Sequence, residues 1–167
     1  MIVSAPPERD AYVALGSNLG DSQRTLSVAI DALHALPDTA VTARSRFYRT
    51  APWGRLDQPD FINAVVRLHT ALSPHALLDA LMQIEAAAGR VREGERWGPR
   101  TLDLDLLHMD GVRLDDARLT LPHPRIRDRA FVLAPLADIA PELPLPGQGR
   151  VAELLRQVDA AGCVALP

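Results

Sequence analysis

The chain has 167 residues, of which 47% are hydrophobic and 23% are charged, and its formal net charge is −3. This length and composition fit one globular domain with a buried core and exclude a disordered chain. All 18 residues counted as Lys or Arg are arginine, which excludes enzymes that depend on a P-loop lysine or a Schiff-base lysine. The negative net charge argues against broad adhesion to nucleic acid or to a membrane surface.

The cysteine content and the N-terminus indicate where the protein acts. The single cysteine, Cys163, excludes an internal disulfide and a cysteine-rich zinc site, and it fits a reducing compartment. Residues 1–7 lack the basic and apolar pattern of a secretory signal. No apolar run approaches the roughly 20 residues that a membrane span needs. We therefore expect a cytoplasmic protein.

The first part of the chain predicts a strand followed by a helix. Residues 11–16 form a short β-type run, and residues 16–20, Gly-Ser-Asn-Leu-Gly, form a turn. Asp21 or Ser22 can cap a helix whose apolar residues recur every three or four positions until Pro37. The turn is typical of an ordinary strand-to-helix connection, but it could also hold a phosphate at the helix N-terminus.

Two further strands are predicted at residues 41–48 and 60–70. The loop at residues 50–59 contains proline, glycine and tryptophan, and its length indicates function or mobility. Asn63 is a polar residue within the apolar run of the second strand. Its amide is either satisfied inside the core or used to hydrogen-bond a heterocycle, and the pattern alone favours neither interpretation.

The second half of the chain predicts a helix, a strand and helical additions. Ser73 and Pro74 open the helix in the usual order of cap and proline, and the helix ends before Gly89. An arginine-rich loop follows and leads into a strand. That strand spans residues 102–109, and a hairpin at 112–121 and a second basic loop at 122–129 follow it. The last elements are a helix at 130–139, a proline-rich coil at 141–149 and a helix at 151–158. The helix at 130–139 is either broken at Pro135 or begins there.

The predicted order of elements is strand, helix, strand, strand, helix, strand, followed by helices. This is the order of the split βαβ pattern, so we predict an α+β fold that is ferredoxin-like (βαββαβ) with additional C-terminal helices. Its antiparallel sheet would carry both main helices on one face. Because the sequence contains neither a linker nor an internal repeat, we expect residues 1–167 to form one domain.

The strand at residues 102–107 carries the most informative motif, Leu-Asp-Leu-Asp-Leu-Leu. Because side chains alternate along a strand, Asp103 and Asp105 share one face, and carboxylates at this spacing suit a hard divalent ion such as Mg²⁺. Four arginines just upstream offer planar forks that match phosphate oxygens, namely Arg90, Arg92, Arg96 and Arg100. These residues indicate a nucleotide site with Mg²⁺. The alternative is an edge strand with two solvated acids beside a solvated arginine loop.

Several specific segments carry a resemblance to a known enzyme family. They are Gly16-Ser-Asn-Leu-Gly20, Ser45-Arg-Phe-Tyr-Arg-Thr50, Asp57-Gln-Pro-Asp-Phe-Ile-Asn63, Arg90-Val-Arg92, Arg96-Trp-Gly-Pro-Arg-Thr-Leu-Asp-Leu-Asp105 and Leu121-Pro-His123. In these segments the sequence resembles the 6-hydroxymethyl-7,8-dihydropterin pyrophosphokinases of folate biosynthesis. The resemblance implies a magnesium-dependent, ferredoxin-like monomer that transfers diphosphate from ATP to the hydroxymethyl group of the pterin, giving AMP and the pterin diphosphate.

The resemblance also implies roles for individual residues. Asp103 and Asp105 resemble the ligands of two Mg²⁺ ions, and Arg90 and Arg92 lie in what resembles a mobile loop that closes over the phosphates, so we expect all four to be catalytic. The residues that match the ATP site are Glu85, Arg92, Trp97, Arg100, His123 and Arg129. Those that match the pterin site are Thr50, Pro52, Trp53, Phe61, Asn63, Trp97 and Phe131.

Some positions depart from the family pattern or have a simpler interpretation. Phe61 stands where the family often has tyrosine, and Trp53 stands where it often has an aliphatic residue. Both changes stay apolar, so we expect the pocket to survive with altered edges. Taken singly, Trp97 could be a core anchor, and His123, between two prolines, could simply stiffen its loop.

Two other classes of protein match parts of the pattern. An RNA-binding module is one, because this fold class also hosts RNA-recognition sheets, but two aspartates on the sheet would repel phosphate without a metal. A metal-dependent phosphohydrolase that uses Asp103 and Asp105 is the other. We expect ATP and the pterin as the binding partners, and neither nucleic acid nor a membrane.

Overall fold

A single antiparallel sheet organises the molecule. The computed structural model describes residues 7–52, 57–89 and 101–167. The central strand, β1 (Arg9–Ser17), pairs with β4 (Phe61–Thr70) on one side and with β5 (Asp103–Met109) on the other. Beyond β4 the sheet continues through β3 (Tyr48–Thr50) to β10 (Val164–Ala165), and β2 (Thr39–Arg44) also pairs with β4. This order of antiparallel strands confirms the predicted ferredoxin-like fold.

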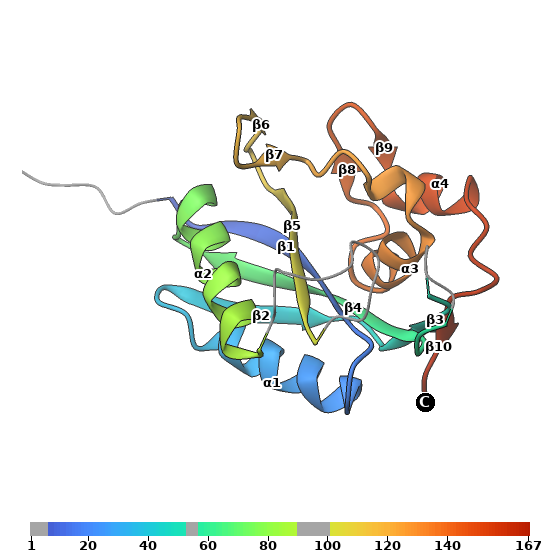
Figure 1. Ribbon diagram of the computed structural model, residues 1–167. Helices are drawn as coiled ribbons and strands as arrows, with labels where there is room; N and C mark the ends of the chain where they lie inside the picture. Colours follow the sequence, from blue (N-terminus) through green and yellow to red (C-terminus); the bar gives the residue numbers. More distant parts are fainter. Residues whose placement is uncertain (1–6, 53–56, 90–100) are drawn as a thin grey trace, which may run out of the picture.

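The helices divide between the two faces of this sheet (Figure 1). The first pair, α1 (Ser22–His34) and α2 (Pro74–Ala87), lies on one face, as predicted. The second pair, α3 (Ala130–Ile139) and α4 (Val151–Arg156), lies on the other face. The predicted helix caps are confirmed, since Asp21 accepts a hydrogen bond from the backbone of Arg24 and Ser73 accepts one from that of Ala76.

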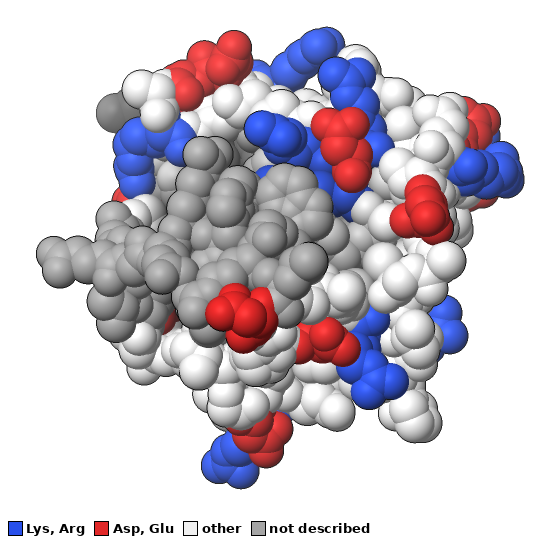
Figure 2. Space-filling view, turned by 45° about the vertical axis from the view of Figure 1, so that its right-hand side comes forward, with Lys and Arg blue, Asp and Glu red and all other residues white. Residues whose placement is uncertain are grey.

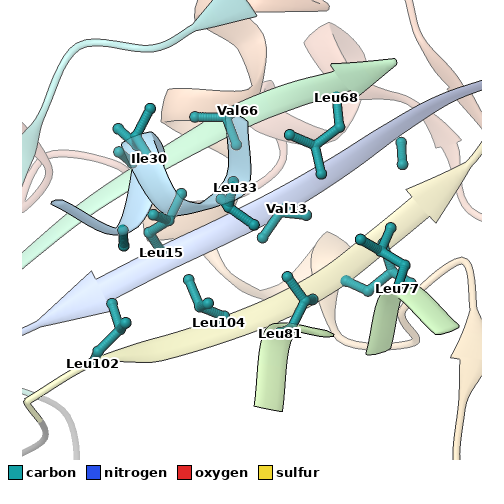
Figure 3. Close-up of a cluster of buried hydrophobic side chains, with 14 of the residues drawn as sticks. Val13, Leu15, Ile30, Leu33, Val66, Leu68, Leu77, Leu81, Leu102 and Leu104 are labelled. Atoms are coloured by element: carbon teal, nitrogen blue, oxygen red, sulfur yellow. The ribbon is translucent and has the colours of Figure 1, made fainter. Parts of the chain in front are cut away.

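The main core fills the space between the sheet and the first helix pair. Figure 3 shows side chains of β1, β4 and β5 pointing toward those of α1 and α2. The labelled members are Val13, Leu15, Ile30, Leu33, Val66, Leu68, Leu77, Leu81, Leu102 and Leu104. Burying one such side chain contributes roughly 1.5–3 kcal/mol. Because alternate residues of each strand fill this core, the remaining residues of the same strands face the opposite side.

A second core lies on that opposite side. Tyr12, Val65 and Leu107 of the sheet pack there against the apolar residues of α3 and α4. Val132, Leu133 and Leu136 supply the buried α3 contribution, and the two leucines are fully buried.

Three predictions about individual elements are wrong. The predicted strand at residues 41–48 is split into β2 and β3, because the Ser45 hydroxyl accepts the backbone N–H of Val65 at 2.9 Å and interrupts the regular ladder. The proline-rich coil contains a small hairpin of β8 (Pro144–Leu145) and β9 (Gly149–Arg150). Helix α3 is neither broken at Pro135 nor begun there, since burial of its apolar residues outweighs one missing backbone hydrogen bond.

The connection from β5 to α3 agrees with the prediction more closely. A hairpin of β6 (Leu114–Asp115) and β7 (Thr120–Leu121) lies within the expected region. The basic loop that follows contains one short 3₁₀ helix, η1 (Ile126–Asp128). None of the helices in the described ranges has the length and apolar character required to cross a bilayer.

Candidate active site

The register of the central strands brings three predicted site residues to one face of the sheet. Gly16 on β1 pairs with Asn63 on β4 and with Asp103 on β5, and Ala14 pairs with Asp105. Directly paired residues point their side chains to the same face. Asn63, Asp103 and Asp105 therefore share a face, while Leu104 between the aspartates is buried in the main core on the other face.

The two aspartates differ in exposure, and a third carboxylate supports the strand between them. Asp105 is exposed and Asp103 is half-buried. The buried Glu85, in the last turn of α2, accepts the backbone N–H of Leu104 at Oε2, at 2.8 Å. This bond crosses from α2 to β5 and holds the peptide that separates the aspartates. Glu85 is thus placed against the strand segment that carries Asp103 and Asp105.

The donor set on β5 fits Mg²⁺ that is shared with a substrate. Within the described ranges, no group of three or more His, Cys, Asp or Glu side chains is arranged to hold a metal ion by itself. Mg²⁺ commonly uses one or two protein carboxylates and completes its shell with water and substrate phosphates. Asp103 and Asp105 supply such a pair.

His123 lies beside β5, because its backbone N–H donates to the carbonyl of Leu107 at 2.7 Å. Its ring Nδ1 accepts the backbone N–H of Arg125 at 3.1 Å, so in the neutral ring the proton is carried by Nε2. Burial lowers the pKa of His123. The negative charge of Asp105 acts to raise this pKa, and the positive charges of Arg129 and Arg125 act to lower it. The ring is therefore held neutral near pH 7, with Nε2–H as a hydrogen-bond donor.

Arg129 and Phe131 lie side by side at the start of α3. The guanidinium carbon of Arg129 stands 5.8 Å from the centroid of the Phe131 ring. Phe131 is partly buried against the second core, which fixes the ring from behind. This contact places a cation from the expected ATP site against an aromatic ring from the expected pterin site.

Asn63 and Thr50 form the polar centre of the expected pterin site. The amide Nδ2 of Asn63 donates to the hydroxyl of Thr50 at 2.8 Å, and both residues are buried. Phe61 is paired with Thr50 and is half-buried on the same face, two residues from Asn63. Pro52, just beyond β3, is also half-buried.

The remaining predicted site residues fall outside the described ranges. They are Trp53, Arg90, Arg92, Trp97 and Arg100. The parts of the predicted site that the structure brings together are therefore the two aspartates with Glu85 and His123, and the group of Thr50, Phe61 and Asn63.

A contact made by the turn at residues 16–20 could not be found from the sequence. The amide Nδ2 of the buried Asn18 donates to the Gln58 side chain at 2.8 Å and to the carbonyl of Pro59 at 3.0 Å. Asp21 caps the first turn of α1 with its carboxylate. A negative charge already stands at that helix N-terminus, so the turn is better explained as a connection that fastens the segment before β4 than as a phosphate cradle.

The surface charge is mixed on one face of the molecule. On the face shown in Figure 2, basic side chains gather in the upper part of the view, with acidic side chains among them. Charges of both signs on the described residues of this face agree with the small negative net charge.

Comparison with known proteins decides the family. The family model described as 7,8-dihydro-6-hydroxymethylpterin-pyrophosphokinase (HPPK) matches residues 12–141. The chain belongs to this family. The predicted resemblance is thereby confirmed, and the match runs from within β1 to just beyond the end of α3, including every described residue of the candidate site.

Individual HPPK relatives are similar in sequence to this chain over most of their length. The 2-amino-4-hydroxy-6-hydroxymethyldihydropteridine pyrophosphokinase of Methylorubrum extorquens is 51% identical over 152 residues, which is 91% of this chain and 95% of the relative. The enzyme of the same name from Pseudomonas aeruginosa is 49% identical over 156 residues, or 93% and 96% of the two chains.

A solved structure with low sequence identity shares the fold. The Plasmodium falciparum HPPK-DHPS crystal structure with pteroate superposes with a TM-score of 0.72 at 13% identity. The match covers 93% of this chain but only 43% of that longer chain. This likeness supports the fold assignment alone.

Proposed function

We propose that this chain carries out the HPPK reaction on the sheet face that holds Asn63, Asp103 and Asp105. It transfers diphosphate from ATP to the hydroxymethyl group of 6-hydroxymethyl-7,8-dihydropterin, giving AMP and the pterin diphosphate, a step of tetrahydrofolate biosynthesis. The observation that carries the proposal is the register of β1, which sets Asn63 and Asp103 on either side of Gly16. A heterocycle-binding amide and a metal-binding carboxylate then face the same space.

Asp103 and Asp105 would hold the Mg²⁺ that accompanies ATP, in our proposal as two ions. Bound there, Mg²⁺ would neutralise phosphate charge and align the reacting oxygens. The chain's own contribution is to keep the two carboxylates on one rigid strand, and the bond from Leu104 to Glu85 supports this arrangement. Diphosphoryl transfer depends mainly on positioning and charge stabilisation, so no nucleophilic side chain is needed.

The pterin would lie against Asn63. A primary amide offers both a donor and an acceptor, which matches the amide-like edge of a pterin. Phe61 and Phe131, with Trp97, would contact the ring, since offset aromatic contacts contribute roughly 0.5–1.5 kcal/mol beyond the area they bury. Thr50 would orient the amide, and Pro52 and Trp53 would complete the wall.

ATP would lie on the side of His123 and Arg129. The neutral His123 can donate from Nε2 to an oxygen or ring nitrogen of the nucleotide, and Arg129 offers a charged fork to phosphate. Glu85 and Arg100 would complete this site. Arg90 and Arg92 would stabilise the charge that develops on the transferred group.

We further propose a monomeric enzyme of one domain that acts in the cytoplasm. The single cysteine is in keeping with a reducing compartment. No role in binding nucleic acid or membranes is proposed.

The deciding experiment follows AMP formation from MgATP with and without the pterin. We expect AMP only when the pterin is present. Asp103→Asn and Asp105→Asn should each lower the rate on the order of a thousandfold, because each loses a metal-binding charge at nearly constant size. Asp31→Asn, on the exposed side of α1, is the control and should leave the rate unchanged. Hydrolysis of ATP at the same rate without pterin would favour the phosphohydrolase instead.

A further inference from the structure

Gly16 occupies a position where the backbone itself does not require glycine. It lies inside β1, and its φ is not in the left-handed region, unlike that of Gly20 in the following turn. Glycine inside a strand makes the folded protein less stable than alanine would. A glycine in this setting usually marks a place where another group approaches the backbone closely.

The approaching group is the side chain of Asn63. A Cβ atom built on Gly16 would stand 2.9 Å from Asn63 Oδ1, which is closer than ordinary carbon–oxygen contacts of about 3.3–3.6 Å. The next nearest atom, the carbonyl oxygen of Ile62, is 4.0 Å away. The space that a side chain at position 16 would fill is therefore occupied by the amide oxygen of Asn63.

The Asn63 amide is thus constrained from two strands at once. On the β3 side, its Nδ2 is bonded to the Thr50 hydroxyl at 2.8 Å. On the β1 side, its Oδ1 lies over the bare backbone of Gly16. The bond to Thr50 pulls one end of the amide toward β3, and the missing side chain at Gly16 leaves room for the other end.

The same position separates the two halves of the proposed site. Gly16 pairs with Asn63 on one side and Asp103 on the other. Neighbouring strands lie about 4.8 Å apart, so Asn63 and Asp103 stand on the order of 10 Å apart across β1. At this level of the sheet β1 adds no side chain of its own between them, and the Asn63 amide oxygen takes the room above Gly16.

We propose that Gly16 is a positioning residue for the pterin: its missing side chain leaves room for the Asn63 amide oxygen and so sets the orientation of the Asn63 amide. The inference rests on the proposed function, because it takes Asn63 to be the residue that binds the edge of the pterin. It adds a specificity device that acts through Asn63 without touching ATP or the metal.

The test compares Gly16→Ala with the wild-type protein by calorimetry and steady-state kinetics. We expect the pterin to bind roughly three- to tenfold more weakly or worse, as for the loss of one hydrogen bond. The KM for the pterin should rise accordingly, while ATP affinity stays within about twofold. Gly162→Ala is the matched control, since Gly162 has an ordinary φ and nothing within 4 Å of an added Cβ. Unchanged pterin affinity in a folded Gly16→Ala protein would overturn the proposal.

A double-mutant cycle with Asn63→Ala shows whether Gly16 acts through Asn63. In that background, Gly16→Ala should weaken pterin binding no further and should cost less in melting temperature than it does alone. If Gly16→Ala alone does not fold, recovery of folding by the added Asn63→Ala supports the contact, and failure to recover overturns it. Wild-type pterin affinity in Asn63→Ala alone would instead refute the proposed pterin site, so the two failures are distinguishable.

Discussion

The backbone N–H of Leu104 donates to the carboxylate of Glu85 at 2.8 Å, which ties the last turn of α2 to the peptide between Asp103 and Asp105. Glu85 is buried, although it is a charged residue near the end of a helix. The side chain of Leu104 packs in the main core, on the face of the sheet opposite to Asp103 and Asp105. The strand between the two aspartates is therefore held by apolar packing of a side chain and by a charge-assisted hydrogen bond to the backbone.

Replacing Glu85 should both destabilise the protein and disturb the strand that carries Asp103 and Asp105. Glu85→Ala leaves the buried N–H of Leu104 without its acceptor, which should cost about 1–3 kcal/mol in the free energy of unfolding. Glu85→Gln keeps an acceptor oxygen and should lose less stability. Urea denaturation measures the stability, and a Mg²⁺ titration of turnover should show a higher requirement in the alanine variant. Glu153→Ala, at an exposed glutamate of α4, is the control. Equal unfolding midpoints for wild type and Glu85→Ala would contradict this role.

The hydrogen bond from Asn63 to Thr50 should contribute to pterin affinity. Thr50→Val keeps the shape of the side chain but removes the acceptor of the Asn63 amide, so the amide loses its preferred orientation. We expect pterin binding to weaken by about 0.5–1.5 kcal/mol. Thr50→Ser retains the hydroxyl and should stay close to wild type. Calorimetric titration with the pterin, at fixed ATP analogue, separates the two variants; equal affinities for both would rule out this contribution.

His108 should make the protein less stable in mild acid. It is buried, its Nδ1 has no hydrogen-bond partner within the described part of the chain, and its Nε2 lies 3.1 Å from Asp110. Burial lowers the pKa of His108, although Asp110 acts to raise it. Between the unfolded value of about 6.5 and the lowered folded value, the unfolded chain binds more protons. The free energy of unfolding should therefore fall as the pH drops below about 6.5.

The variant His108→Leu tests this pH dependence. It removes both the titrating ring and the unpartnered nitrogen while keeping an apolar side chain in the second core. We expect a smaller loss of stability than in wild type between about pH 7.5 and about pH 5.5. Some dependence should remain, because burial also lowers the pKa of His123. Denaturation curves at both pH values give the comparison, and parallel losses in the two proteins would exclude His108 as the cause.

A polar cluster fastens α3 to the start of β3. Asp138 on α3 accepts the Tyr48 hydroxyl at 2.7 Å and a bidentate pair from the Arg46 guanidinium at 2.9 and 3.1 Å. Burial acts to raise the pKa of Asp138, but the hydrogen bonds from Arg46 and Tyr48 outweigh it, so the pKa is lowered. Because α3 also carries Phe131 and β3 carries Thr50, this cluster holds two parts of the proposed pterin site in register.

Asp138→Asn should lower the free energy of unfolding at about pH 7 by roughly 1–2 kcal/mol, since charge-assisted hydrogen bonds become neutral ones. A carboxyl with a lowered folded pKa stabilises the protein above its unfolded pKa, and this contribution disappears as the pH falls through the folded value. The difference between variant and wild type should therefore shrink toward about pH 3. Tyr48→Phe removes the hydrogen bond from the Tyr48 hydroxyl to Asp138 and should lose less stability than Asp138→Asn. A difference that stays constant with pH would show that the charge of Asp138 is not responsible.

The sequence by itself determined those features that depend on local pattern. The alternation of Leu and Asp in residues 102–107 predicted one polar and one apolar face, and β5 has both, because neighbouring side chains of any strand point to opposite sides. The caps of α1 and α2 followed from Asp21 and Ser73, since a cap needs only a side-chain oxygen at the right step before the helix. The order of the predicted strands and helices led to the ferredoxin-like fold, and the specific motifs led to the family.

Only the tertiary structure decided which distant residues meet. The contacts of Asn63 with Thr50 and Gly16, of Glu85 with Leu104 and of Asn18 with Gln58 join separate elements. The interruption between β2 and β3 likewise depends on the bond that Ser45 makes with β4. Sequence periodicity specifies which face of an element is buried, but it does not specify the register in which two elements pair. That register sets Gly16 between Asn63 and Asp103, and it brings the two halves of the proposed site onto a common face.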